Sequence, residues 1–389
     1  MTVATTFPVS FIGVVAPSAR ADLHFSGAVV GLIAATYWAA SATVALTAGA
    51  FVRRTPPRAL MALCVGLAAL ALLGDAAISP SWQWLVVWAA VGGAANALGH
   101  PSSNTLLVRD VPLRLRALAF GVKQAAIPIA SVLTGAALPL VVVRFGWRSA
   151  FVPAVVLCVL SCVWILCLPR DASRASRPVP GRVSRDRGGV PRASLPFLLA
   201  VAATTMVASF QSNAMTAFLV SGARHVRIDA STAGLLLVVA SLSAAGTRAL
   251  AGGVAGRWHG KALVTVAVLL GVGALGLTAM ASGTRAGFLV GAVVAFVGAY
   301  GWPGLIHFVV ADAMGEATPG ATLLTQSGSY VGSTFGPITF GLLFDASPGV
   351  MWFVMAGCAA AASVIALVAH GRYRTWTAVQ TPVPSPADH

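Results

Sequence analysis

The fold is decided by a run of twenty residues, ALMALCVGLAALALLGDAAI, from Ala59 to Ile78. Asp75 is its only charged residue, and it lies near the end of the run. About 20 apolar residues in an α-helix, rising 1.5 Å each, cross the ~30 Å hydrocarbon core of a bilayer. Arg58 precedes the run and Pro80 follows it, so both ends are marked. This stretch therefore predicts a transmembrane helix.

Eleven further stretches of the same kind occur in the chain, separated by Pro, Gly or charged residues. They run Val3–Ala19, Ala28–Phe51, Trp82–Val108, Ala117–Val143, Ala150–Leu168, Leu195–Val220, Thr232–Val254, Lys261–Ala281, Gly287–Ala311, Ala321–Phe344 and Val350–Ala369. Strands are not expected, because the alternation of a membrane barrel is absent and open strand edges cannot be satisfied in lipid. The sequence predicts an all-α membrane protein with twelve spans.

The composition excludes a water-soluble domain of ordinary polarity. Of the 389 residues, 58% are hydrophobic and only 9% are charged, whereas soluble domains carry roughly 25% charged residues. The net charge of +15 raises the question of a nucleic-acid partner, but such a partner needs basic residues on a wetted face. Here the charges lie between apolar segments, so we expect a lipid bilayer as the surroundings and no nucleic acid.

The basic residues also predict the orientation. With twelve spans, seventeen of the 25 Lys and Arg fall on the side that carries both termini, and six fall on the other side. Only Lys123 and Arg248 lie inside spans. The positive-inside rule then predicts a multi-pass protein of the plasma (inner) membrane with both termini in the cytoplasm.

An internal repeat divides the chain into two halves. A shift of 202 positions superposes residues of types that rarely match by chance: Gly99 on Gly301, Pro101 on Pro303, Asp110 on Asp312, and Gln124 on Gln326. Between the sixth and seventh spans lies an Arg-rich segment without hydrophobic periodicity, typical of a cytoplasmic linker. We expect two six-helix halves, 1–168 and 195–369, joined by a linker over 169–194 and followed by a cytoplasmic tail over 370–389.

This organisation resembles the major facilitator superfamily, whose members have two six-helix halves related by an axis along the membrane normal. The loop from Gly252 to Lys261, GGVAGRWHGK, is similar to the family's Gly-x-x-x-Asp-Arg-x-Gly motif, with Gly256 in the aspartate position. The resemblance implies gating roles for Gly252, for Arg257 and, in the weaker first-half copy, for Arg54. In the family the acid helps to lock the gate, so its absence puts that interaction in doubt.

Ionisable residues inside spans are costly and mark functional sites by default. No Asp or Glu lies near the middle of any span, whereas Lys123 and Arg248 lie about six residues from the predicted cytoplasmic ends of spans five and eight. In the family these two helices face each other across the halves. Two positive charges there predict an anionic cargo, although snorkelling to the interface remains an alternative, and for Arg248 so does bracing of the gate.

Other polar side chains fall on helices that line the cavity in the family. Each one either contacts the substrate or joins helices together, and the sequence leaves both possibilities open. The candidate substrate-binding residues are Tyr37, Asn96, His100, Gln211, Asn213, Tyr300, Trp302, Gln326 and Tyr330.

No enzyme motif, nucleotide-binding loop or metal-ligand cluster is present in the sequence, so we expect neither enzymatic activity nor a cofactor or metal. The sequence predicts a secondary transporter that works as a monomer and moves a small anion by alternating access. The run Gly121-Val122-Lys123-Gln124, followed by Pro128, is similar to the cyanate-permease-like branch of the family. The alternative is an efflux protein for amphipathic compounds, with a site formed by Trp38, Tyr300, Trp302 and Tyr330.

Overall fold

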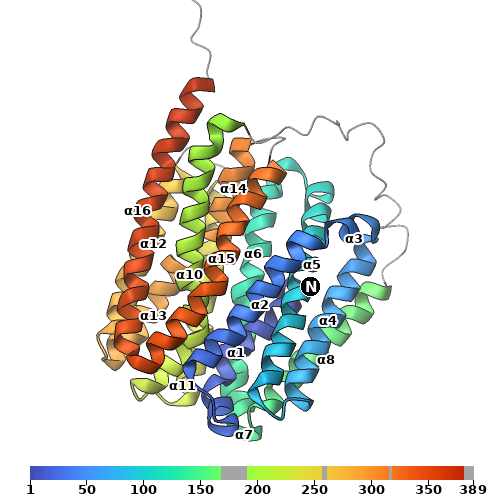
Figure 1. The fold of residues 1–389 in the computed structure, drawn as a ribbon, viewed down its shortest axis with the longest axis vertical. Helices are drawn as coiled ribbons and strands as arrows, with labels where there is room; N and C mark the ends of the chain where they lie inside the picture. Colours follow the sequence, from blue (N-terminus) through green and yellow to red (C-terminus); the bar gives the residue numbers. More distant parts are fainter. Residues whose placement is uncertain (168–190, 256–260, 315–317, 381–389) are drawn as a thin grey trace, which may run out of the picture.

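A computed structural model gives the fold of the chain (Figure 1). It describes residues 1–167, 191–255, 261–314 and 318–380. Within these ranges, side chains are described for all residues except 49, 53, 100–110, 113, 114, 116, 117, 120, 252–255, 311, 318–320 and 378–380. Helices make up nearly all of the described part, and no strand occurs in it.

The first half contains α1 (Thr2–Leu23), α2 (Gly27–Thr47), α3 (Gly49–Arg54), α4 (Pro57–Ala77), α5 (Trp82–Asp110), α6 (Leu113–Ala137), the π-helix η1 (Leu138–Val142), α7 (Val143–Phe145), η2 (Arg148–Ala150) and α8 (Phe151–Cys167). The second half contains η3 (Arg192–Ser194), α10 (Leu195–His225), α11 (Ala230–Ala255), α12 (Ala262–Ala281), α13 (Arg285–Ala299), α14 (Pro303–Met314), α15 (Thr318–Ala346) and α16 (Pro348–Gln380).

The prediction of twelve membrane-crossing helices is confirmed. Ten stretches of the described chain are long and apolar enough to cross a bilayer, and α5 and α15, at 29 residues each, complete the set. The fifth crossing combines α6 with η1 and α7, and the tenth combines α13 with α14. The protein is therefore an all-α membrane protein built from two six-helix bundles.

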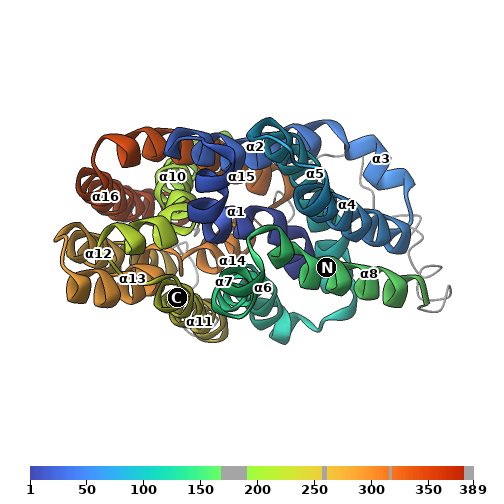
Figure 2. The ribbon, with the colours of Figure 1, turned by 90° about the horizontal axis from the view of Figure 1, so that it is seen from below.

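The two bundles meet along a small set of helices. Figure 1 shows α10, α12, α13 and α16 on one side of the molecule and α4, α5 and α8 on the other. Across the boundary α2 packs on α15, α6 packs on α11, and α1 packs on α10. The view from below shows α11 beside α6 and α7 (Figure 2). Any site between the halves is thus lined by these six helices and by α14, which also contacts α6.

Three differences from the predicted spans have local causes. The second span ends at Thr47, and its last predicted residues form the separate helix α3. The tenth span breaks after Ala299 because Pro303, which has no N–H, starts a new helix. Span twelve continues beyond Ala369 to Gln380, so the first part of the predicted tail is helical. The predicted linker lies mostly outside the described residues.

Small residues set the closest helix contacts. Gly328, Gly332 and Gly336 repeat every four positions on α15, and a Cβ at any of them would overlap a backbone carbonyl of α10. This stripe therefore serves close packing inside the second half.

At the start of α11, Asp229 accepts a hydrogen bond from the Thr232 N–H at 2.9 Å, and its bonds to Thr232 lower the pKa of this carboxyl.

Candidate functional site

The bundle has two ends. We call the end at which α1 turns into α2, α10 into α11, and α15 into α16 the turn end. The opposite end, toward which α16 runs to its last residue, is the terminus end (Figure 1). The halves are joined differently at the two ends, and this difference locates the candidate site.

At the turn end an aspartate of the second half joins two helices of the first. Asp345, near the end of α15, accepts hydrogen bonds from the backbone N–H groups of Gly27 and Ala28, both at 2.9 Å. The same carboxylate pairs with Arg20 of α1 at 3.2 Å. The first turn of α2 has no cap from its own Ser26, so a carboxylate of the opposite half supplies it. This set of bonds is called the Asp345 contact below.

Close backbone packing continues this closure into the membrane. A Cβ at Gly31 on α2 would overlap the carbonyl of Pro337 on α15, so the position accepts glycine alone without a shift. On the other side of the boundary, Gly135 on α6 packs against Gly234 on α11 in the same way. The described contacts therefore close the halves against each other at the turn end.

Deeper in the membrane, basic groups from both halves meet. Lys123 on α6 is half-buried, as is His307 on α14. The Arg248 Nη1 donates at 3.0 Å to the carbonyl of Gln124, the residue that follows Lys123, and His307 lies within electrostatic range of both bases. The structure thus places the two bases that the sequence singled out on neighbouring helices of the two halves, with the imidazole of His307 on α14 in range of both.

Arg248 is only 2% exposed, and its guanidinium contacts two backbone carbonyls. Its Nε and Nη2 donate to the Tyr300 carbonyl at 2.9 and 2.7 Å, and its Nη1 donates to the Gln124 carbonyl at 3.0 Å. The charge also lies over the Tyr300 ring, 4.4 Å from its centroid. Arg248 is therefore bound to protein groups, a geometry that suits a brace better than a simple cargo contact.

A second buried side chain, that of Gln211, donates a hydrogen bond to a backbone carbonyl at the break between α13 and α14. Gln211 on α10 is fully buried and donates from Nε2 to the Ala299 carbonyl at 3.1 Å. Four residues after Ala299 stands Pro303, which has no N–H to donate, so this carbonyl has no helical partner. Gln211 stabilises the break, while its own Oε1 is buried without a hydrogen-bond partner.

Three of the predicted substrate residues are used in helix packing. The Tyr37 hydroxyl donates to the Thr5 carbonyl at 2.8 Å and so joins α2 to α1. Asn96 on α5 donates to the Ser41 hydroxyl at 3.4 Å, and Asn213 on α10 donates to the Ser333 hydroxyl at 2.8 Å. In this arrangement their polar atoms join helices, the second of the two roles considered above.

The remaining aromatic and amide candidates have different surroundings. The Tyr37 hydroxyl lies within electrostatic range of those of Tyr330 and Tyr300. Gln326 and Tyr330 are partly exposed on α15. Trp302 is buried in the core of the second half, and its indole N–H has no hydrogen-bond partner among the described residues. Trp38 packs edge-on against Tyr37, and its indole N–H is likewise unsatisfied.

The predicted gating residues are only partly visible. Arg54 is exposed at the end of α3. Gly252 lies in the last turns of α11, but its surroundings fall outside the described residues, as does Arg257 altogether. The side chain of His100 on α5 also lies outside the described part.

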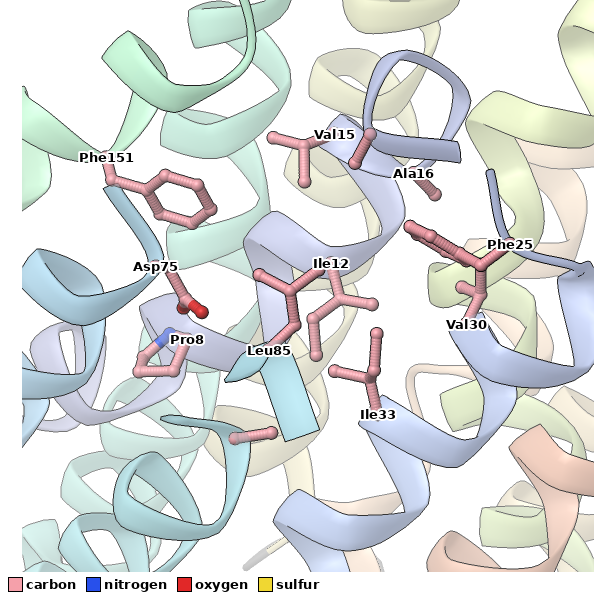
Figure 3. Close-up of a pocket in the computed structure, with 12 residues that line it drawn as sticks. Pro8, Ile12, Val15, Ala16, Phe25, Val30, Ile33, Asp75, Leu85 and Phe151 are labelled. Carbon is pink, nitrogen blue, oxygen red and sulfur yellow. The ribbon is translucent and has the colours of Figure 1, made fainter. Parts of the chain in front are cut away.

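A small cavity lies inside the first half, apart from this site. Figure 3 shows the Asp75 carboxylate directed into it between Phe151 and Pro8, with apolar side chains around it. About 20 Å³ is open to water-sized molecules, which is room for one or two. Of the predicted substrate residues whose side chains the structure describes, none lines this cavity.

Two six-helix bundles that close on each other at one end and carry polar groups between them are typical of membrane transporters. The family model of the Major Facilitator Superfamily matches residues 1–321. The chain belongs to this superfamily and is a multi-pass membrane protein. A search of curated proteins finds no match.

Solved transporters share the fold. A bacterial homologue of the human lysosomal transporter Spinster, in its inward-facing and unoccupied conformation, superposes with a TM-score of 0.70 at 14% identity, covering 99% of this chain and 97% of that one. A D-xylose–proton symporter superposes with a TM-score of 0.72 at 13% identity, covering 94% and 95%. Identities this low establish similarity of fold only.

Proposed function

We propose that the protein is a secondary transporter that moves a small anion across the inner membrane by alternating access. The turn end faces outside the cell and both termini lie in the cytoplasm, as the distribution of basic residues predicts. In this orientation the closed turn end makes the structure an inward-facing one. The protein works as a monomer in this proposal.

The observation that supports the proposal is the hydrogen bond of the Arg248 Nη1 to the carbonyl of Gln124 at 3.0 Å, which brings this base beside the residue next to Lys123 at the boundary between the halves, with His307 in electrostatic range of both. Three described carboxylates in or beside spans have other surroundings: Asp75 faces the cavity of the first half, Asp345 belongs to the turn end, and Asp312 on α14 lines a hollow with Ala262 and Tyr373. A local excess of basic groups in a low-dielectric region favours a negatively charged ligand. In this proposal Lys123 is the principal charge partner of the anion, and Arg248, which binds two carbonyls, braces the helices.

The second candidate function is efflux of amphipathic compounds. It is favoured by the unsatisfied indole N–H groups of Trp38 and Trp302, which would donate to a polar atom of an aromatic ligand. Placement in the cyanate-permease-like branch stays a prediction based on the short run around Lys123.

The test is uptake of an organic- and inorganic-anion panel into proteoliposomes. We expect Lys123→Gln to reduce anion flux at least tenfold, since removing a charge partner of a desolvated anion costs more than about 1.4 kcal/mol. The chain offers a matched control, because its other lysine, Lys261, is exposed at the start of α12. Lys261→Gln should transport as the wild type does.

Anion flux that Lys123→Gln leaves intact would refute the assignment. Flux of amphipathic cations that survives in Lys123→Gln and falls on replacement of Trp38 would favour the efflux alternative. Repeating the assay with and without an imposed pH gradient decides whether protons are coupled to the transport.

A further inference from the structure

A proline on α6 creates the acceptor to which Arg248 binds. In an α-helix the carbonyl of Gln124 would accept the N–H of the residue four positions later, which here is Pro128. Proline has no N–H, so this carbonyl has no partner within α6. A buried carbonyl left in this state is costly, and the Arg248 Nη1 of the second half donates to it at 3.0 Å.

Arg248 is firmly held on its own side of the boundary. Two of its nitrogens donate to the carbonyl of Tyr300, the residue that ends α13 at the break before α14. The last carbonyls of a helix lack intrahelical donors and favour a cation, so the guanidinium fits this position in both respects. Contact with the Tyr300 ring fixes its orientation further.

The bond between Arg248 and Gln124 lies well away from the turn end. Gln124 precedes Gly135, the close-contact residue of α6, by eleven positions, which is about 16 Å along the helix axis. It is also adjacent in sequence to Lys123. The halves are thus joined at two levels: by packing at the turn end, and by this hydrogen bond at the level of the candidate site.

We propose that Arg248 is a positioning residue that ties α6 to the second half through the carbonyl freed by Pro128, and that this hydrogen bond stabilises the arrangement closed at the turn end. The inference goes beyond the proposed function and does not depend on the charge of the substrate. As a consequence, Arg248 sets the ratio between the arrangements closed and open at the turn end, while Lys123 sets the affinity for the substrate.

The test measures that balance without substrate. Spin labels at Gln83→Cys and Ser282→Cys, both exposed at the turn end in opposite halves, report its opening in a background without the native cysteines. Arg248→Met removes the donor. Pro128→Ala restores an N–H to α6. This N–H can bond to the Gln124 carbonyl within the helix, so that the carbonyl no longer depends on Arg248 for a donor.

Two matched controls separate the effect of losing the bond between Arg248 and Gln124 from the general effects of replacing an arginine or a proline. Arg58 also donates to a carbonyl, that of Ile165 at 3.0 Å, but both residues belong to the first half. Pro17 is a proline inside α1, and no described side chain donates to the carbonyl of Gly13 that it frees. Arg58→Ala and Pro17→Ala should leave the balance as in the wild type.

We expect Arg248→Met and Pro128→Ala each to shift the ratio of closed to open turn ends about tenfold toward open, as loss of a charge-assisted bond predicts. The double variant should shift no further than the single ones, because both act on one bond. In transport assays KM should change less than twofold while the maximal rate changes. An unchanged ratio in Pro128→Ala, additive shifts, or a change confined to KM would overturn the proposal; none of these outcomes bears on whether the substrate is an anion.

Discussion

Removal of the Asp345 carboxylate is expected to open the turn end. Asp345→Ala deletes the acceptor of the Gly27 and Ala28 N–H groups and the ion-pair partner of Arg20 in one step. All three bonds cross between the halves. The change should therefore act on the balance between arrangements and have little effect on the folding of either half.

The size of the effect follows from the exposure of the groups. The side chains of Arg20 and Asp345 are 27% and 31% exposed, so their ion pair is screened and contributes at most about 1 kcal/mol. Capping of the first turn of α2 contributes about 1 kcal/mol more. Together they predict a shift of about 1–2 kcal/mol, which changes the ratio of closed to open turn ends about 5- to 30-fold.

The spin labels at Gln83→Cys and Ser282→Cys measure this ratio directly. Asp229→Ala is the matched control, because Asp229 also caps a helix but binds only within its own half. A distance distribution in Asp345→Ala that matches those of the wild type and of Asp229→Ala would refute the reasoning.

Three further predictions concern stability and are checked by thermal unfolding in detergent. Gln211→Leu should lower stability by about 1–3 kcal/mol, because the buried carbonyl of Ala299 loses its donor. Gly31→Val should lower stability by a similar amount, because the valine side chain would overlap the carbonyl of Pro337. An unchanged melting temperature in Gln211→Leu or in Gly31→Val would contradict the packing described. Gly66→Ala should raise stability by up to about 1 kcal/mol, because open space surrounds this helical position, and a loss there would argue against the arrangement of α4.

Much of the fold could be predicted from the sequence, because the bilayer imposes a simple length rule on apolar runs. All twelve crossings and the duplication followed from this rule and from the repeated residues. The break at Tyr300 was not predicted, although Pro303 stood in the tenth span. A hydropathy pattern does not show that proline lacks an N–H. The break could have been predicted only from the position of Pro303 within the span.

The candidate site was only partly predictable. Lys123 and Arg248 stood out because charges are rare in spans, and the structure places both near His307. The sequence did not show that Arg248 is bound by carbonyls, although the spacing of Gln124 and Pro128 signals one free acceptor. Asp345 was missed altogether, because its partners are backbone N–H groups of the other half and leave no trace in the sequence.

In the proposed function, Lys123 makes the site selective for an anion. The most direct measurement is equilibrium binding of the anion panel, with neutral amide analogues, to the purified protein and to Lys123→Gln. We predict that at least one anion binds the wild type, that its amide analogue does not, and that Lys123→Gln raises the Kd for the anion at least tenfold. Equal affinity for anion and amide, or an unchanged Kd in Lys123→Gln, would contradict it.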